Sequence, residues 1–380
     1  MSQRRERFFA TCAPGLEPVL HEELKALGLS KVERQTGGVY FEGSLADALR
    51  ANLWLRTAIR VLMRVARFEA KDADALYERA REVDWNRFVR PEGTLIVDAH
   101  SKESALDHTL FIEQRVKDAI VDAVRAKHGT RPSVAKENAD LGVYAHLFRD
   151  RCTLLVDTSG ESLHKRGWRA FQGRAPLAES VAAALVLLSK WNGRAPLIDP
   201  FCGSGTLLVE AAWIAENRAP GLLRASFGLE RWSESEAALA ARLRSEARAA
   251  QRPSKALLVG RDRDPKTIQG ALENVDAAGL AGRIALDVGE ALELEPRKGW
   301  NAWLLSNLPY GGRIGDQREV TELYRRFGRW LREHCAGFHV GLLVERGKLS
   351  ATLALSNPVH HPILNGGLEC EFLLSEVAQP

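Results

Sequence analysis

The order of strands and helices in the C-terminal half constrains the fold of this chain most strongly. From about residue 177, short apolar strands end in loops that contain glycine or acidic residues, and helices follow these loops. Strands that are apolar throughout and alternate with helices are typical of a parallel sheet covered on both faces. We therefore predict an α/β fold with a doubly wound, mostly parallel sheet over residues 177–380.

Residues 1–65 are predicted to form a small α+β module. RERFFATC, GGVYFEG and AIRVLMRVARF have the composition and alternation of strands, whereas LEPVLHEELKALG and SLADALRANLWL have helical spacing. Ser44 stands at the N-cap position of the second helix. Antiparallel strands with helices between them indicate a ferredoxin-like arrangement.

Residues 66–160 are predicted to form a second small module, and residues 161–176 a linker. A long amphipathic helix ends at Gly129, and the strands GVYAHLFRD and RCTLLVDTSG form a candidate hairpin joined by Asp150. The module contains no cluster of acids, histidines or nucleophiles. It is therefore expected to bind or position a substrate.

Composition restricts the class of protein. The 380 residues are 45% hydrophobic and 27% charged, and no apolar run approaches the roughly 20 residues that a membrane helix needs. The N-terminus lacks the apolar segment of a signal peptide. The five cysteines are dispersed, without a CxxC pair or zinc spacing. We expect a cytoplasmic protein without a membrane segment or a metal.

The positive charge is concentrated in two windows. Residues 151–200 contain seven basic and four acidic side chains, and residues 301–350 contain eight and five. Basic residues interleaved with aromatic residues are typical of a groove that holds phosphates and stacks bases; ordinary solvated helix faces are the alternative. The candidate RNA-binding residues are Lys165, Arg166, Trp168, Arg169, Arg174 and Arg313.

The segment LIDPFCGSGT (197–206) is the first candidate binding element. Asp199 follows an apolar strand, and Gly203 and Gly205 form the turn into a helix. Glycines let a ligand approach the backbone, and a helix N-terminus presents free N–H groups to a carboxylate. The spacing is neither GxGxxG nor GxxxxGK[ST], so a dinucleotide or a triphosphate fits less well.

Two further strands end in acidic residues. In VGRDRDP (259–265), Asp262 is the first candidate for binding a ribose; Asp264 is the second, with an N-cap as its alternative role. In VGEALEL (288–294), Glu290 is a candidate acceptor for an adenine amino group.

The segment SNLPYGG (306–312) follows the apolar strand AWLL. Asn307 offers an amide oxygen, Pro309 restricts the backbone, and Tyr310 offers a flat ring. Inward-facing oxygens can accept hydrogen bonds from an exocyclic amine while the ring stacks on the base. A plain turn is the alternative for this segment alone, but four such loops at strand ends of one parallel sheet should share one crevice.

At four places the chain resembles a known family. DPFCGSGT is similar to motif I of class I S-adenosylmethionine (AdoMet) methyltransferases, and SNLPYGG is similar to their [NDS]PP[YFW] motif for amino methylation. HKRGWRAFQGRAPLAESVAAALV and APGLLRASFGLERW resemble THUMP-domain RNA guanine-N2 methyltransferases of the ribosomal large-subunit methyltransferase L and YpsC type. The resemblance implies a ferredoxin-like segment (1–65), a THUMP RNA-binding domain (66–160) and a Rossmann-like class I methyltransferase domain (177–380).

The resemblance also implies roles for individual residues. It places AdoMet on Asp199, Pro200, Phe201, Gly203, Ser204, Gly205, Thr206, Asp262, Arg263, Glu290, Ala291 and Asn307. The amine-orienting, catalytic turn is Asn307, Leu308, Pro309 and Tyr310. Leu308 replaces the usual first proline, and Glu290 stands where aspartate is commoner.

The implied reaction is methylation of the exocyclic N2 of a guanosine, with 23S ribosomal RNA as the first choice of substrate and transfer RNA as the second. Three alternatives remain: amino methylation of DNA adenine or protein glutamine, a non-catalytic RNA-binding protein on the same fold, and a nicotinamide oxidoreductase. The last fits least, since the third glycine of a dinucleotide site is missing.

Overall fold

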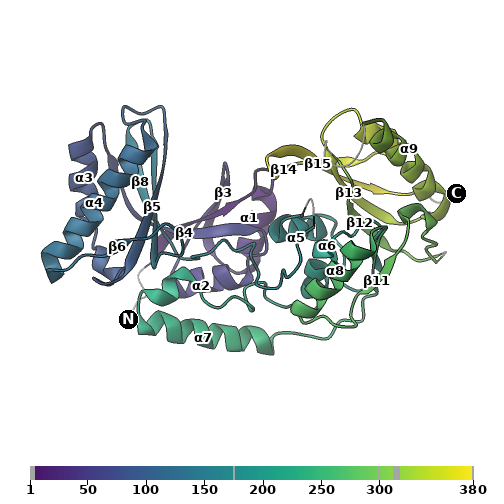
Figure 1. The fold of residues 1–380 in the computed structure, drawn as a ribbon, viewed down its shortest axis with the longest axis horizontal. Coiled ribbons are helices and arrows are strands. Elements are labelled where there is room, and N and C mark those ends of the chain that lie inside the picture. The colour runs from purple at the N-terminus through teal and green to yellow at the C-terminus, as the bar shows by residue number, and fades with distance from the viewer. Residues whose placement is uncertain (1–4, 174–175, 298, 311–316, 379–380) are drawn as a thin grey trace. The chain divides into compact units, whose positions relative to one another are not determined.

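The computed structural model describes residues 5–173, 176–297, 299–310 and 317–378. The chain divides into two compact units (Figure 1). The first contains the residues up to 12, 21–163 and 224–246, and the second contains 13–20, 164–223 and the residues from 247 onwards. Each unit is built around one β-sheet.

The described part of the first unit contains a sheet of eight strands. These are β1 (Glu6–Cys12), β2 (Ser30–Gln35), β3 (Gly38–Gly43), β4 (Ala58–Glu69), β5 (Thr94–Lys102), β6 (Ser133–Val134), β7 (Leu141–Phe148) and β8 (Arg151–Asp157). The N-terminal part of the chain also forms α1 (Glu17–Ala26), α2 (Leu45–Trp54), α3 (Ala73–Arg81), α4 (Thr109–His128) and the 3-10 turn η1 (Trp85–Arg87). The strand order is β2-β3-β1-β4-β8-β7-β5-β6, and β5 runs parallel to β6 and β7.

Alternating residues give this sheet two unlike faces. Along β7, Leu141, Val143, Ala145 and Leu147 are buried, whereas the residues between them are more exposed. Successive side chains of a strand point to opposite faces, so one face carries the apolar residues. Helix α4 contacts both β5 and β7, and α3 contacts β4.

Three local predictions are confirmed. The Ser44 side chain accepts a hydrogen bond from the Asp47 amide, and the Asp47 carboxylate accepts one in return from the Ser44 amide. Helix α4 ends at Gly129, which has a φ of +72°. Arg149 and Asp150 both have positive φ and join β7 to β8 in an antiparallel hairpin.

The two predicted N-terminal modules share one sheet. Strand β4 pairs with β1 on one side and with β8 on the other. The boundary predicted between residues 65 and 66 lies within β4. Strand β2 was not predicted, because SKVERQ has almost no apolar residues and mostly exposed side chains.

The second unit contains a seven-stranded sheet. Its strands are β9 (Leu197–Asp199), β10 (Leu258–Asp262), β11 (Ala285–Val288), β12 (Trp303–Asn307), β13 (His339–Glu345), β14 (Val359–Asn365) and β15 (Leu368–Glu376). The order is β11-β10-β9-β12-β13-β15-β14, with parallel pairing from β11 to β13 and antiparallel pairing of β15 with both neighbours. The predicted doubly wound, mostly parallel sheet is confirmed.

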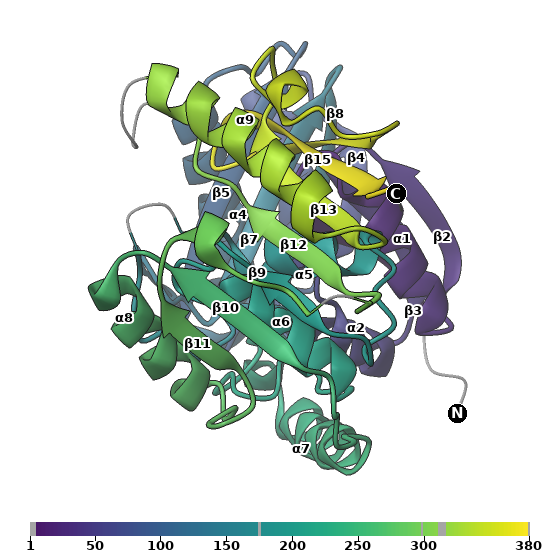
Figure 2. The ribbon, with the colours of Figure 1, turned by 90° about the vertical axis from the view of Figure 1, so that its right-hand side faces the viewer.

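Helices cover both faces of this sheet. They are α5 (Glu179–Leu188), α6 (Thr206–Ala215), α8 (Pro265–Ala277) and α9 (Gln317–His334), with 3-10 turns η3 (Ala291–Glu293) and η4 (Ser350–Leu353). Figure 2 shows α9 on one face and α5 and α6 on the other. Tyr324, Phe327 and Leu331 of α9 pack in one apolar cluster with Leu304 and Leu342 of the sheet.

The long segment between α6 and β10, predicted to be mostly helical, is helical over about half of its length. It contains η2 (Gly228–Arg231) and α7 (Glu234–Ala249). Residues 224–246 group with the first unit, although the prediction placed them inside the methyltransferase domain.

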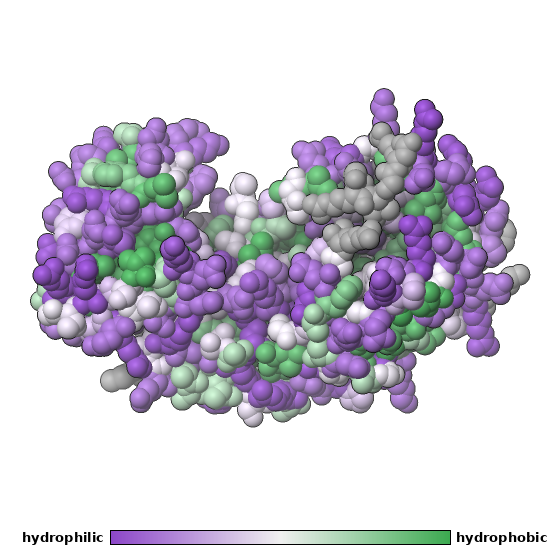
Figure 3. Space-filling view, in the orientation of Figure 1, coloured by the Kyte–Doolittle hydropathy of each residue, from purple (hydrophilic) through white to green (hydrophobic). Residues whose placement is uncertain are grey.

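All five cysteines lie in the described residues and are buried free thiols. No helix in the described ranges is both long and apolar enough to cross a membrane. Hydrophilic side chains cover most of the surface visible in Figure 3, and the apolar patches between them are small.

Candidate active site

The carboxyl ends of three neighbouring parallel strands create the site. Strand β9 lies between β10 and β12, and all three run in the same direction. The loops after these strands therefore leave the same edge of the sheet, where ligands of doubly wound folds bind. These loops begin at Asp199, Asp262 and Asn307.

The loop after β9 is a glycine turn into α6. Gly203 and Gly205 have φ values of +52° and +78°, in the region that favours glycine. No described atom lies within 4 Å of the position where a Cβ of Gly203 would be. Pro200, Ser204 and Thr206 are buried. The predicted turn is therefore confirmed, and it leaves open space above the Gly203 backbone.

Asp199 is a buried acid that joins this loop to the loop after β12. Its Oδ1 accepts a hydrogen bond from Ser306 Oγ at 2.6 Å and one from the Phe201 amide at 3.2 Å. Burial raises the pKa of Asp199 to about 7, and the charge of Asp262 adds to this rise, whereas the two hydrogen bonds oppose it. The predicted proximity of the 306–310 turn and the 199–206 loop is confirmed by the Ser306 bond.

Asp262 lies directly beside the glycine turn. Its Oδ2 accepts a hydrogen bond from the Gly203 amide at 3.2 Å, and its Oδ1 accepts one from the Asp264 amide at 2.9 Å. Asp264 is the N-cap of α8 and accepts hydrogen bonds from Lys266 N and Thr267 Oγ1. Of the two alternatives for the ribose contact, Asp262 is therefore the one placed at the glycine turn.

Glu290 lies at the next strand end, after β11. Its side chain is exposed, and its carbonyl oxygen accepts a 3.4 Å hydrogen bond from Arg261. Arg261 also pairs with Asp287, and this pairing raises the pKa of Arg261. Arg263 is exposed, whereas Ala291 is buried. The loop is thus held by backbone and Arg261 contacts, and the Glu290 carboxylate faces solvent.

The 306–310 turn is fixed at two of its backbone groups. The Leu308 amide donates to the Leu343 carbonyl at 3.0 Å, and the Pro309 carbonyl accepts a hydrogen bond from Tyr324 Oη at 2.9 Å. Asn307 Oδ1 differs from these groups: it is buried and has no hydrogen-bond partner among the described residues. A buried acceptor without a partner costs about 1–3 kcal/mol, so a donor from a ligand would stabilise it.

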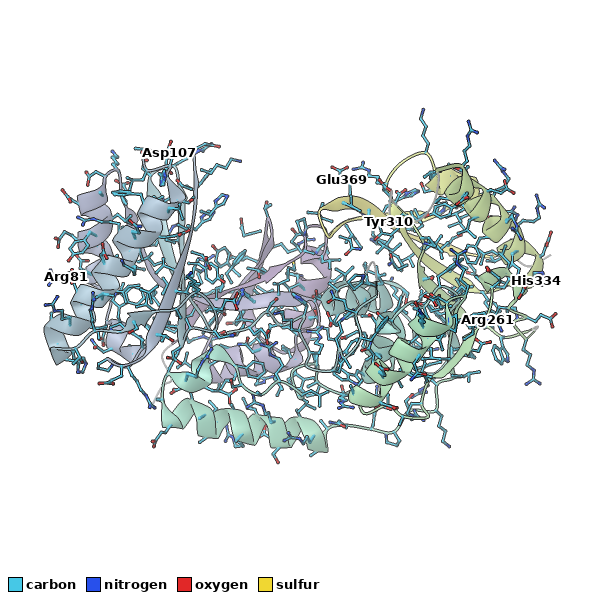
Figure 4. The ribbon with its side chains drawn as sticks, viewed as in Figure 1. Arg81, Asp107, Arg261, Tyr310, His334 and Glu369 are labelled. Atoms are coloured by element: carbon cyan, nitrogen blue, oxygen red, sulfur yellow. The ribbon has the colours of Figure 1, made fainter. Side chains whose placement is uncertain are left out.

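Tyr310 is held by the C-terminal hairpin. Its hydroxyl accepts a hydrogen bond of 2.7 Å from Asn365 Nδ2, at the end of β14. Burial raises the pKa of Tyr310 far above its usual value. Figure 4 shows Tyr310 near the turn of this hairpin, where Glu369 is also labelled. The ring is therefore an uncharged flat group at every physiological pH.

The RNA-binding prediction is wrong for Arg166 and Trp168. Both side chains are 1% exposed, so neither can face a nucleic acid. Arg166 forms a buried ion pair with Glu210 of α6, and the Trp168 ring packs edge-to-face on Trp213. Arg166 and Trp168 therefore pack in the interior. The prediction failed because their partners on α6 could not be recognised from the spacing.

Arg169 is also occupied within the protein. Its guanidinium donates to Glu179 Oε1, to the Leu177 carbonyl and to Thr206 Oγ1, at the first residue of α6. It therefore supports the glycine loop from outside. Lys165 is exposed. Arg174 and Arg313 lie outside the described residues.

Two residues that organise the site were not predicted. Ser306 connects Asp199 to the amine-site turn. Asn274, fully buried on α8, accepts hydrogen bonds from the amides of Ala170 and Phe171 and donates to the Ser204 carbonyl. An asparagine on the apolar stripe of α8 was a usable signal for the second, whereas nothing in the sequence marked Ser306.

Family models match three consecutive parts of the chain. The model described as "RlmL ferredoxin-like domain" matches residues 7–62, the THUMP domain model matches residues 70–157, and the model described as "RMKL-like, methyltransferase domain" matches residues 166–373. A protein of Methylococcus capsulatus named ribosomal RNA large subunit methyltransferase K/L is 41% identical over 98% of this chain. The alignment covers 51% of that protein, so the chain spans about half the length of the curated relatives it matches.

Two solved structures are similar over nearly the whole chain. The putative methyltransferase SMU.472, complexed with SAH, has a TM-score of 0.90 at 29% identity. The match covers 100% of this chain and 99% of that chain. A predicted N6-adenine-specific DNA methylase from Listeria monocytogenes has a TM-score of 0.86 at 31% identity, with 99% of this chain and 97% of that chain covered. With more than half of its length matched by the methyltransferase model, this chain belongs to the RMKL-like methyltransferase-domain family, and ferredoxin-like and THUMP domains precede that domain.

Proposed function

We propose that this chain transfers the methyl group of AdoMet to the exocyclic N2 of a guanosine in RNA, with 23S ribosomal RNA as the substrate. The observation that carries the proposal is the buried, unpartnered Oδ1 of Asn307, in a turn bonded through Ser306 to Asp199. A buried acceptor next to a glycine loop suits an amine that must be held beside a bound donor. The names of the curated relatives support ribosomal RNA.

The residues at the strand ends fit AdoMet. The open space above Gly203 admits a ligand close to the backbone, and Asp199 is a buried carboxylate suited to the ammonium group of the methionine part. In this proposal, Asp262, which accepts a hydrogen bond from the Gly203 amide, binds the ribose, and Glu290, which is exposed after β11, binds the adenine. When bound, AdoMet supplies a methyl group already activated by its sulfonium charge.

The 307–310 turn would orient the attacking nitrogen. The lone pair of the guanine amine is delocalised into the ring, so hydrogen bonds from that amine to Asn307 Oδ1 and the Leu308 carbonyl would turn it toward the methyl group. The Pro309 carbonyl already accepts a hydrogen bond from Tyr324, which holds the turn in place. Tyr310 would stack on the base, an interaction of about 1–3 kcal/mol that offsets part of the cost of unstacking.

The other parts of the chain have supporting roles in this proposal. Residues 1–65 and 66–160 would bind and position the RNA, and residues 177–380 would catalyse the methyl transfer. Residues 161–176 would connect the RNA-binding part to the catalytic domain. The protein would act in the cytoplasm. Arg169, which is partly buried, and fully buried Asn274 would hold the loop that binds AdoMet. Transfer RNA is the second candidate substrate, favoured by Leu308 in the NLPYG sequence.

A transfer assay with defined products tests the proposal. The chain, tritiated AdoMet and ribosomal or transfer RNA from a strain lacking the gene should yield N2-methylguanosine, identified by nucleoside mass spectrometry. Label in transfer RNA alone would move the substrate to that pool. N6-methyladenosine as the product, or AdoMet binding without transfer to any RNA, would contradict the proposal.

A further inference from the structure

The face of the eight-stranded sheet that points away from its apolar residues is rich in cations and rings. Along β1, Phe8 and Ala10 are buried, whereas Arg7 and Phe9 are partly exposed. Along β7, His146 is exposed between buried Ala145 and Leu147. We call this surface the outer sheet face and define it by Arg7, Tyr40, Arg64, Arg67, His100 and His146.

Strand register places these residues on one surface. Directly paired residues of neighbouring strands lie on the same face of a sheet. Thr153 pairs with both Arg67 and His146, and His146 pairs with His100. Phe9 pairs with Tyr40 in the other half of the sheet. Because β4 joins the two halves, the outer sheet face is continuous across the ferredoxin-like and THUMP segments.

The centre of this face carries positive charge. The side chains of Arg64 and Arg67 form no hydrogen bond or ion pair within the described residues. Partial burial lowers the pKa of Arg64, and so do the charges of Arg7 and Arg67. Three acids of this face are paired: Glu33 with Arg7, Glu42 with Lys31 and Asp157 with Arg60. Two exposed acids also lie on it, Glu69 at the end of β4 and Asp98 on β5, two residues before His100. An anion is therefore the complementary partner for the centre.

Flat rings flank this charge on both sides. The rings of Phe9 and Tyr40 lie 4.6 Å apart, and the Arg7 guanidinium lies 4.7 Å from the centre of the Tyr40 ring. On the THUMP side, His100 and His146 are stacked at 5.4 Å and only 5° from parallel. Proteins that bind single-stranded RNA stack its bases on aromatic rings and guanidinium planes and bind its phosphates with cationic side chains.

We propose that the outer sheet face binds a single-stranded segment of RNA. Phosphates lie on Arg64 and Arg67, and bases stack on Tyr40 with Phe9 at one end and on the histidine pair at the other. From β3 to β5 the face crosses five strand spacings, about 24 Å, which matches the smallest site sizes of single-strand binders, about 4 nucleotides. This inference rests on the proposed RNA substrate, but its residues are separate from the methyl-transfer turn.

Charge reversal on this face provides the test. The full chain and the double variant Arg64→Glu/Arg67→Glu are titrated into a labelled single-stranded RNA of about 12 nucleotides, and anisotropy is measured at several salt concentrations. We expect at least about tenfold weaker binding and a shallower salt dependence, since about two phosphate contacts are lost. The double variant Arg79→Glu/Arg81→Glu is the control, because these exposed arginines lie on α3, at the helical side of the sheet.

A second double variant tests stacking independently. His100→Ala/His146→Ala should weaken single-strand binding by about fivefold or more, with an unchanged salt dependence. Circular dichroism establishes that each variant is folded. A duplex of the same sequence should bind the wild-type chain less tightly than the single strand, since its bases are not free to stack.

The outcomes separate this inference from the proposed function. Unchanged single-strand affinity in the Arg64/Arg67 variant overturns the inference and leaves the face to another partner, such as an acidic protein. Preference for the duplex, or no RNA binding by the wild-type chain, also overturns it. AdoMet binding, measured by calorimetry, should be the same in all variants. Loss of single-strand binding in a chain that methylates no RNA would uphold this inference while the proposed function fails.

Discussion

The two sheets of this protein place their arginines in opposite ways. In the seven-stranded sheet, helices cover both faces, and Arg166 and Arg169 of the preceding segment are paired with Glu210 and Glu179. In the eight-stranded sheet, Arg64 and Arg67 lie on the outer sheet face, and their side chains have no partner among the described residues. Arg166 and Arg169 stabilise the fold through ion pairs, whereas the side chains of Arg64 and Arg67 are available to a ligand. Local charge density alone cannot distinguish the two roles.

The largest expected effect is on stability, at Arg166. Arg166→Met removes one member of the buried ion pair with Glu210, so we expect a loss of about 3–5 kcal/mol in the free energy of unfolding. Chemical denaturation monitored by tryptophan fluorescence measures this.

The double variant Arg166→Met/Glu210→Leu is the control and should recover most of the stability, because it replaces both members of the ion pair with apolar side chains. An Arg166→Met chain that is as stable as wild type but binds RNA less tightly would contradict the structural role of Arg166. It would indicate that Arg166 contacts RNA.

The next effect is on chemistry, at Asn307. Asn307→Ala removes the buried acceptor and should lower the rate of methyl transfer by at least about 100-fold, within the range found when one preorganised polar group at a reacting centre is removed. AdoMet affinity should change little, because the Asp199 and Gly203 contacts stay. Single-turnover kinetics and calorimetry measure the two quantities.

Asn301→Ala is the matched control, since Asn301 is exposed and precedes β12. Full transfer activity in the Asn307 variant would remove the assignment of the amine site.

A smaller effect concerns the pH dependence at Asp199. Its pKa is raised to about 7 in the folded chain, so the folded state holds this proton more tightly than the unfolded state. Its contribution to stability is therefore present below about pH 4 and is lost as the pH rises toward 7. Asp199→Asn should be more stable than wild type at pH 8, by between about 1 and 3 kcal/mol.

AdoMet binding should show the opposite dependence, because its ammonium group favours the carboxylate. Wild-type affinity should rise from pH 6 to pH 8 and then level off, and the Asn variant should bind weakly at every pH. Calorimetric titrations across this range measure it, with Asp264→Asn as the exposed control. A wild-type affinity that does not vary between these pH values would contradict the role of Asp199.

The smallest effect concerns the Tyr310 hydroxyl. Tyr310→Phe keeps the stacking ring and removes one hydrogen bond, from Asn365, so we expect transfer to fall by only about threefold to tenfold. Tyr310→Ala should lose far more, since it also removes the stacking surface. Equal losses in the two variants would mean that the hydroxyl has a role beyond holding the ring.

Sequence reasoning predicted the elements whose causes are local. The N-cap at Ser44, the helix end at Gly129 and the hairpin joined by Asp150 depend on neighbouring residues, and the structure contains all three. The alternation of apolar strands and helices likewise determined the second sheet. The turns at Asp199, Asp262 and Asn307 were predicted from their place after strands, because parallel strands bring such ends to one edge.

Tertiary structure alone decided which polar groups meet. The Ser306–Asp199 bond joins residues 107 positions apart, and the pairing of Arg166 with Glu210 depends on how residues 164–173 lie against α6. The continuation of one sheet through β4 depends on edge pairing, which strand composition does not encode. The sequence by itself determined periodicity, caps and turns, since these follow from residues a few positions apart. Burial and long-range hydrogen bonds required the folded chain. They placed Arg166 and Arg169 in ion pairs within the protein and left the Arg64 and Arg67 side chains without a partner in the part of the chain that the structure describes.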